Sequence, residues 1–189
     1  MGFNITIPYK EEIIPMLDKL SKTAKIIGAV NCVTVSKKRK LKGYNTDYYG
    51  FKKSIKPLLK EHHKKALILG TGGASKAVAY ALRKLKIEYD FVSRTPDEFQ
   101  FDYADLNAEV FEEYHIIINT TPVGTHPNVE DFPNLDYSLF TKKHIAYDLV
   151  YNPEETAFLK KAKELGAKTK NGYDMLVFQA EKAWKIWNE

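Results

Sequence analysis

Several polar side chains in the first part of the sequence could act on a small molecule. Lys10 follows a predicted strand, Asn31 interrupts an apolar segment, and Asp47 lies where a helix is expected to begin. Asn4 and Thr6 would share one face of their strand, because side chains alternate along an extended chain. Each of these residues also has an ordinary structural explanation when taken alone. Their functional interpretation depends on the nucleotide-binding pattern that follows them.

A glycine-rich loop at 70–75 reads Gly-Thr-Gly-Gly-Ala-Ser and separates an apolar segment from a run of good helix formers. Glycines let backbone N–H groups approach a diphosphate, and the N-terminus of a helix attracts its negative charge. Ser75 replaces the third glycine of the usual fingerprint, and a tight turn without a ligand is the alternative. The order of strand, loop and helix nevertheless predicts a dinucleotide site. Its candidate residues are Gly70, Gly72, Gly73 and Ala74.

The next predicted strand ends in Ser93, Arg94 and Thr95. Folds that prefer NAD place an Asp or Glu there, where it binds the ribose 2′-hydroxyl. An Arg suits a 2′-phosphate instead, because the guanidinium group matches phosphate geometry, and the two hydroxyls add further donors. The alternative is an Arg in a surface turn. The three residues favour NADP(H), with modest selectivity because no second basic residue follows closely.

A further loop, residues 119–124, follows another apolar strand and reads Asn-Thr-Thr-Pro-Val-Gly. It lies at the carboxyl end of the predicted parallel sheet, where open α/β folds bind their ligands. We expect Thr120, Thr121 and Pro122 to pack against the cofactor, although this sequence alone would also suit an ordinary loop.

The hydrophobic pattern predicts the elements that position these residues. Strands alternate with helices after residue 64, which indicates an α/β protein with a Rossmann-like parallel sheet. The region before it contains three strands, too few for an independent core. Thr46 is a candidate N-cap. The predicted strands cover 3–8, 28–35, 41–45, 65–69, 87–92, 115–119, 145–149 and 167–170, and the predicted helices cover 9–20, 46–59, 74–85, 154–166 and 175–187.

Composition excludes several classes of protein. The apolar fraction is 44% and the apolar runs are short, whereas a membrane span needs roughly 18 apolar residues, so we expect neither a transmembrane helix nor a signal peptide. The single cysteine, Cys32, excludes an intrachain disulfide and fits the cytoplasm. The five histidines lack metal-ligand spacing, so no metal is expected.

The net charge is +5, and basic residues, mostly lysines, cluster at 37–40 and 52–65. A nucleic-acid surface is one interpretation, and solvated hairpin tips and helix faces are the more ordinary one. A mildly basic protein also suits a carboxylate substrate and a phosphorylated cofactor. We therefore expect small-molecule partners, no nucleic acid, no membrane, and a monomer or weak dimer.

Eight motifs that cover essentially the whole chain resemble, in order, those of the shikimate dehydrogenase family. The match is specific because the motifs occur as a series. They are residues 2–10, 28–32, 43–50, 70–75, 93–95, 119–124, 147–153 and 171–180.

The resemblance implies reversible reduction of 3-dehydroshikimate to shikimate with NADP(H). Lys10 and Asp47 match the catalytic pair, in which an ammonium group held by a carboxylate donates a proton to the substrate oxygen. The positions that match substrate-binding residues are Thr6, Asn31, Tyr151 and Gln179. The segment that matches the nicotinamide side of the cofactor site includes Gly172, Met175 and Leu176, and Leu149 is a further cofactor-binding candidate.

The resemblance also implies the domain organisation. We expect a partial substrate-binding domain at 1–46 and an NADP-binding domain with a linker helix at 47–171. A C-terminal helix at 172–189 would return to the first domain and close the cleft. The family carries an additional N-terminal stretch with a Ser-x-Ser pair that grips the substrate carboxylate, and no such motif precedes Met1.

This departure leaves alternatives open. One is a fragment or pseudoenzyme that binds the dinucleotide without catalysis. Another is a dehydrogenase of quinate or another cyclic hydroxy acid.

Overall fold

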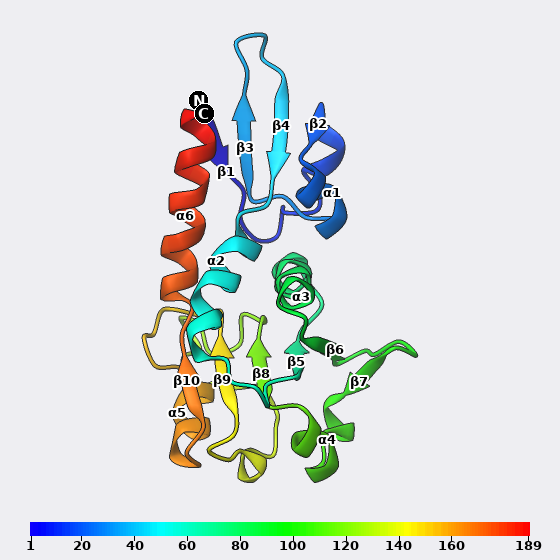
Figure 1. Ribbon diagram of the computed structural model, residues 1–189, viewed down its shortest axis with the longest axis vertical. Coiled ribbons are helices and arrows are strands. Elements are labelled where there is room, and N and C mark those ends of the chain that lie inside the picture. Colours follow the sequence, from blue (N-terminus) through cyan, green and yellow to red (C-terminus); the bar gives the residue numbers. More distant parts are fainter.

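The computed structural model describes residues 1–189, which form a smaller sheet and a larger sheet joined by long helices (Figure 1). The smaller sheet has four strands in the order β1, β3, β4, β2. β1 and β4 both run antiparallel to β3. The elements of this part are β1 (Gly2–Asn4), β2 (Lys19–Leu20), α1 (Lys22–Ile27), β3 (Cys32–Val35) and β4 (Leu41–Tyr44).

The larger sheet has six strands in the order β10, β9, β8, β5, β6, β7, and all of its pairings are parallel. The predicted α/β class with a Rossmann-like parallel sheet is confirmed. The chain moves from β5 to β6 on one side and later returns to β8 on the other side of β5, so the order reverses between β5 and β8. The strands are β5 (Lys65–Leu69), β6 (Glu88–Ser93), β7 (Gln100–Asp102), β8 (Ile116–Asn119), β9 (Ile145–Asp148) and β10 (Lys168–Lys170).

Helices cover both faces of the larger sheet, because alternate side chains of each strand point to opposite faces. Ile68 packs with the residues of α2, α3 and α6, and its neighbour Leu67 packs with those of α4 and α5. This double burial explains the continuous apolar runs of these strands. The helices are α2 (Asp47–Ile55), α3 (Gly73–Leu85), α4 (Ala108–Glu113), α5 (Ala157–Glu164) and α6 (Tyr173–Asn188).

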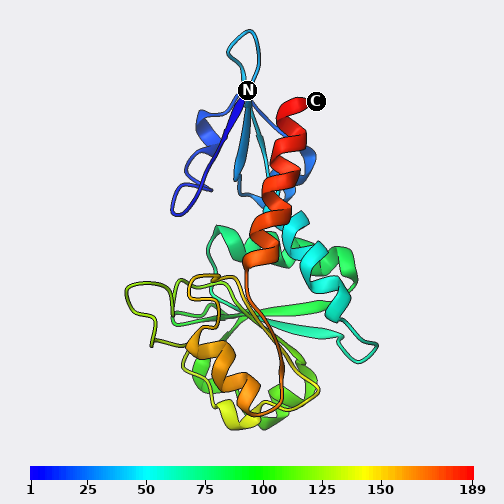
Figure 2. The same cartoon turned by 90° about the vertical axis from the view of Figure 1, so that its left-hand side faces the viewer.

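The helix α6 runs from the larger sheet to the smaller one beside α2, and it ends close to the N-terminus of the chain (Figure 2). At its far end, Trp187 Nε1 donates to the carbonyl oxygen of Val33 at 3.0 Å. Near its start, α6 lies so close to α2 that a Cβ atom added at Gly50 would be 2.4 Å from the carbonyl oxygen of Met175. Gly50 therefore sets the separation of the two helices that join the sheets.

The predicted helix at 9–20 is wrong. This segment forms turns and a short 3₁₀ helix at Ile14–Met16. Pro15 lacks the N–H that a continuing helix would need and its ring would crowd the preceding turn. The apolar residues of this segment still pack against Val33 and its neighbours, through Ile13, Ile14 and Leu17. Their spacing therefore reflects burial and not a helix.

The predicted strand at 3–8 is shorter than expected, because its ladder with β3 ends at the pair Asn4 and Cys32. Thr46 does precede α2, but its side chain makes no capping bond and points into the site described below. The short elements α1, α4 and β7 had no sequence prediction. None of the helices is both long enough and apolar enough to span a membrane.

Replacing Gly50 with Ala should destabilise the protein by about 1–3 kcal/mol, because overpacking against the α6 backbone outweighs the better helix propensity of Ala. Urea unfolding followed by circular dichroism measures this change. The matched control is Lys160→Ala on the exposed surface of α5, which should stay within about 0.5 kcal/mol of the wild type. Equal stability of the two variants would contradict the close helix contact.

Candidate active site

A cavity of about 550 Å³ lies between the two sheets, within the size range of small-molecule sites. Its walls come from the loop after β1, the start of α2, the loops after β8 and β9, and the first turns of α3 and α6. The lining residues are Asn4, Ile5, Thr6, Ile7, Lys10, Asn31, Asp47, Ala74, Thr120, Thr121, Pro122, Thr125, Leu149, Val150, Tyr151, Asn152, Gly172, Met175, Leu176 and Gln179.

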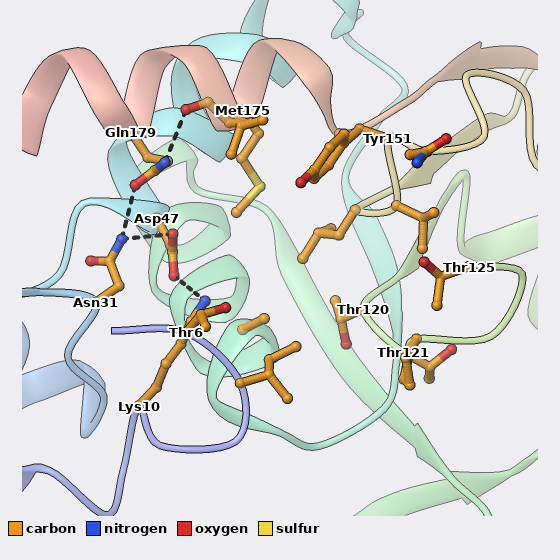
Figure 3. A pocket seen from close by; sticks show the side chains of 18 of the residues that line it. Thr6, Lys10, Asn31, Asp47, Thr120, Thr121, Thr125, Tyr151, Met175 and Gln179 are labelled. Carbon is orange, nitrogen blue, oxygen red and sulfur yellow. Dashed lines mark hydrogen bonds and ion pairs between the residues drawn. The ribbon is translucent and has the colours of Figure 1, made fainter. Parts of the chain in front are cut away.

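Lys10 and Asp47 form an ion pair in the cavity wall, with Lys10 Nζ 2.7 Å from Asp47 Oδ2 (Figure 3). Their side chains are 14% and 7% exposed. The backbone of the Lys10 loop is anchored by a bond from Val30 N to Lys10 O at 2.7 Å. Asp47 is the first residue of α2, where a carboxylate is favoured by the helix dipole. The arrangement holds an ammonium group at the edge of the cavity.

Asn31 orients the second oxygen of that carboxylate. Its Nδ2 lies 2.9 Å from Asp47 Oδ1, 2.9 Å from Thr46 Oγ1 and 3.1 Å from Gln179 Oε1, while its Oδ1 accepts from Thr46 N at 2.6 Å. Gln179 belongs to α6, and its own Nε2 donates to Leu176 O at 3.0 Å. Two of the residues predicted to bind the substrate, Asn31 and Gln179, thus also hold the Lys10–Asp47 ion pair in place.

The other two predicted substrate residues lie apart from this network. Thr6 is beside Lys10, and Tyr151 faces the network from across the cavity (Figure 3). Tyr151 is 47% exposed, and its hydroxyl makes no hydrogen bond to another residue. Hydroxyl and amide groups therefore line two facing walls of the cavity, one beside the Lys10 ammonium group and one opposite it. This arrangement suits a polyhydroxylated ligand.

The glycine loop fits a dinucleotide diphosphate. Gly70 has a φ of +99°, which favours glycine, and a Cβ atom there would be 2.9 Å from the Thr121 side chain. A Cβ atom at Gly72 would meet nothing within 4 Å, so no protein contact requires a glycine at that position. The open space lies at the N-terminus of α3 and at the point where the strand order reverses, which is where such folds bind dinucleotides.

The predicted cofactor residues fall into two groups. One group lines the cavity and consists of Ala74, Thr120, Thr121, Pro122, Leu149, Gly172 and Met175. Within this group, a Cβ atom at Gly172 would be 2.0 Å from Leu149 O, so only glycine fits at that position. The other group does not line the cavity. Gly70 and Gly72 lie in the loop after β5 and Gly73 is the first residue of α3. Ser93, Arg94 and Thr95 lie at the end of the adjacent β6, and both Arg94 and Thr95 are exposed.

A buried network supports the cavity wall from behind. Asp148 Oδ1 accepts from Asn119 Nδ2 and from Val150 N, both at 3.0 Å, and its Oδ2 accepts from Thr156 Oγ1 at 2.6 Å. Asn119 Oδ1 in turn accepts from Thr121 N and Thr121 Oγ1. Burial raises the pKa of Asp148 to about 6, and the three bonds oppose this rise. One carboxylate thus holds both the loop after β8 and the loop after β9.

Sequence reasoning missed several residues of the site. Thr46 bridges Asn31 and Gln179, although it was predicted only as a helix cap. Thr125, Val150 and Asn152 line the cavity beside predicted residues. Thr125 directly follows the predicted loop at 119–124, and its side-chain hydroxyl could have marked it as a candidate site residue in the sequence.

Comparison with known proteins gives consistent relatives. A family described as "Shikimate dehydrogenase substrate binding domain" matches residues 1–33. The shikimate dehydrogenase (NADP(+)) of Aquifex aeolicus is 44% identical over 99% of this chain and 71% of its own length. Its crystal structure matches with a TM-score of 0.87 over the same shares of the two chains.

Two further solved structures match over 98% of this chain and 72% of their own. A shikimate 5-dehydrogenase from Thermus thermophilus, in complex with NADP(H) and shikimate, is 36% identical with a TM-score of 0.85. A quinate dehydrogenase from Corynebacterium glutamicum, in complex with NAD, is 30% identical with a TM-score of 0.80.

The Asp148→Asn variant should gain stability relative to the wild type as the pH rises from about 4 to about 6. The folded protein holds the Asp148 proton up to a pKa of about 6, whereas the unfolded chain releases it near 3.8, so wild-type stability falls across this window. The difference in unfolding free energy between the two proteins should change by about 3 kcal/mol across this window and stay constant above it. Urea unfolding at a series of pH values measures it. Parallel stability curves would show that the carboxylate is not the titrating group.

Proposed function

The chain belongs to the shikimate dehydrogenase family, and on this premise we propose that it reduces 3-dehydroshikimate reversibly to shikimate with NADPH. Members of this family are oxidoreductases, and the relative from Aquifex aeolicus is an NADP(+) enzyme by name. The observation that supports the proposal most is the Lys10–Asp47 pair, with 2.7 Å between Nζ and Oδ2, in a cavity that extends to the loops around the glycine-rich turn.

Lys10 is the proposed proton donor. NADPH, when bound, would supply a hydride to the ketone carbon, and the ketone oxygen would then need one proton. The Lys10 ammonium group stabilises the negative charge that develops on that oxygen and transfers a proton to it. Asp47 keeps the amine positioned and balances its charge. In the reverse direction, the pair would take the hydroxyl proton of the substrate.

The remaining polar groups would orient the substrate. We propose that Asn31, Gln179 and Thr6 contact its hydroxyl groups on the side of the acid–base pair. Tyr151 would close the opposite side. This places donors and acceptors around a small ring without a further cation, since Lys10 is the only Lys or Arg in the cavity lining.

The cofactor would lie along the carboxyl ends of β5, β6 and β8. We propose that Gly70, Gly72, Gly73 and Ala74 hold the diphosphate. Arg94, with the hydroxyl groups of Ser93 and Thr95, would bind the 2′-phosphate. The nicotinamide end would be lined by Thr120, Thr121, Pro122, Leu149, Gly172 and Met175.

A second candidate function is binding of the dinucleotide without turnover. It is favoured by the single cation in the cavity, which is already paired with Asp47, because the substrate carboxylate then lacks a charged partner. A third is oxidation of quinate or a related cyclic hydroxy acid, which the match to the Corynebacterium glutamicum protein keeps open. We propose small-molecule ligands in each case, and a monomer or weak dimer remains a prediction.

Replacing Lys10 with Met should lower turnover of shikimate by about 10²–10⁴-fold, because the aliphatic stem stays and the proton carrier is lost. Absorbance of the reduced cofactor measures turnover with shikimate and, separately, with quinate. Lys160→Ala serves as the control and should retain full activity. A Lys10→Met protein with wild-type turnover would contradict the assigned role.

Calorimetry with NADP and with shikimate separates the candidate functions. The dehydrogenase proposal expects both ligands to bind to the wild type, and Lys10→Met should bind NADP normally. Binding of NADP without binding of shikimate or quinate would favour the non-catalytic function.

Replacing Arg94 with Ala should weaken NADP binding about 10-fold or more, because a charge-assisted contact to the 2′-phosphate contributes about 1.5–3 kcal/mol. NAD lacks that phosphate, so its dissociation constant should stay unchanged. Titration of both cofactors against both proteins tests this. An equal loss for NAD and NADP would assign Arg94 a structural role instead.

A further inference from the structure

Glu11, the neighbour of Lys10, forms an ion pair with Lys76 in the first turn of α3. We propose that this pair is a positioning contact that couples the loop carrying Lys10 to the helix that opens the cofactor site. The inference rests on the proposed function for its catalytic meaning, but the contact itself can be tested without turnover.

The loop and the helix already touch at Gly73. A Cβ atom there would be 3.3 Å from Lys10 Cβ, 3.6 Å from Ala29 Cβ and 3.6 Å from Glu11 Oε1. The backbone of Gly73 has ordinary helical geometry with no positive φ. Glycine is therefore favoured at this position by the close approach of the loop and not by the backbone conformation. Lys76, three residues further along α3, then meets the Glu11 carboxylate.

The same loop is anchored on its other side to the smaller sheet. Val30 N donates to Lys10 O at 2.7 Å, and the Lys10 side chain reaches Asp47 on α2. Lys10 therefore lies between two anchors. One belongs to its own sheet, and the other belongs to the helix that begins at the glycine loop. A shift of the first turn of α3 would be transmitted to Glu11 and from there to Lys10.

The exposure of the Glu11–Lys76 ion pair suits a contact that positions the loop better than one that stabilises the fold. Glu11 and Lys76 are 42% and 39% exposed, and ion pairs this exposed contribute little to stability. The pair nevertheless lies beside the N-terminus of α3, where the anionic cofactor is proposed to bind. The Glu11 carboxylate repels that anion and Lys76 attracts it, so cofactor binding should respond oppositely to loss of the two charges.

Amide hydrogen exchange of the full chain tests the coupling. The amides of Ile13 and Ile14 report on the loop, since they donate to Tyr9 O and Glu11 O. In Glu11→Gln and in Lys76→Met they should exchange about two- to fivefold faster than in the wild type, the fold-change that an exposed ion pair supports. The double variant should be no faster than either single variant, because both remove one contact.

Glu113→Gln is the matched control, since it removes another exposed ion pair, with Lys65, at the opposite end of the larger sheet. It should leave the exchange of the loop unchanged. Unchanged loop exchange in Glu11→Gln, or additive effects in the double variant, would overturn the proposal.

NADP titration provides the second readout. Glu11→Gln should bind NADP as tightly as the wild type or more tightly, and Lys76→Met should bind it more weakly. NADP should slow exchange of Ile13 and Ile14 in the wild type and not in the variants. Equal weakening of NADP binding in both variants would indicate general loss of structure and refute a positioning role.

Failure of the wild type to bind NADP would refute the proposed function, and the exchange rates without NADP would still decide the inference. Where the wild type turns over, Glu11→Gln should lower kcat while its KM for NADP does not rise.

Discussion

Burial of a charged pair in the cavity wall is the constraint on which much of this structure depends. Removing an ammonium and a carboxylate from water is costly unless every lone pair and proton finds a partner. Asp47 meets this requirement through Lys10 on one oxygen and Asn31 on the other. Asn31 is in turn held by Thr46 and by Gln179, so the solvation of one carboxylate involves the loops of the smaller sheet, the start of α2 and the last helix.

The packing of α2 against α6 follows from this requirement. Gln179 reaches Asn31 only if α6 lies close to α2, and Gly50 permits that distance. Trp187 fixes the far end of α6 on the smaller sheet. The last helix therefore completes the site that the first fifty residues begin, because it supplies Gln179, one of the partners that hold Asn31 against Asp47.

A comparable constraint governs the other wall of the cavity. The loops after β8 and β9 come from adjacent strands and would move separately without a shared support. Asp148 supplies the support, since its carboxylate accepts bonds from Asn119, Val150 and Thr156. The three hydrogen-bond donors favour the ionised form of the Asp148 carboxyl group, whereas burial favours its neutral form. Burial is the larger effect, so the pKa of Asp148 is raised.

Local sequence patterns predicted the parallel strands, the glycine loop and its helix, because these depend on short-range apolar spacing and backbone freedom. The helix expected at 9–20 failed for a local reason, the proline at position 15. The Asn31–Gln179 bond joins residues 148 positions apart, and the Glu11–Lys76 contact joins two chain segments that pack only in the tertiary fold. Neither has a periodic signature. The ordered family motifs predicted that Asn31 and Gln179 would share a cleft, but not the bond between them and not the contact of Glu11 with Lys76.

The electrostatics of the cavity follow from helix placement more than from side-chain charge. Lys10 and Asp47 nearly cancel, so the pair offers little net attraction to an anion. Three helices nevertheless begin at the cavity: α2 at Asp47, α3 at Gly73 and α6 at Tyr173. Their N-termini each present partial positive charge and backbone N–H groups. Asp47 and Asp174 already lie in the first turns of α2 and α6, whereas the first turn of α3 has no acidic residue, so the N-terminus of α3 favours an anionic ligand even though the single cation of the cavity is already paired.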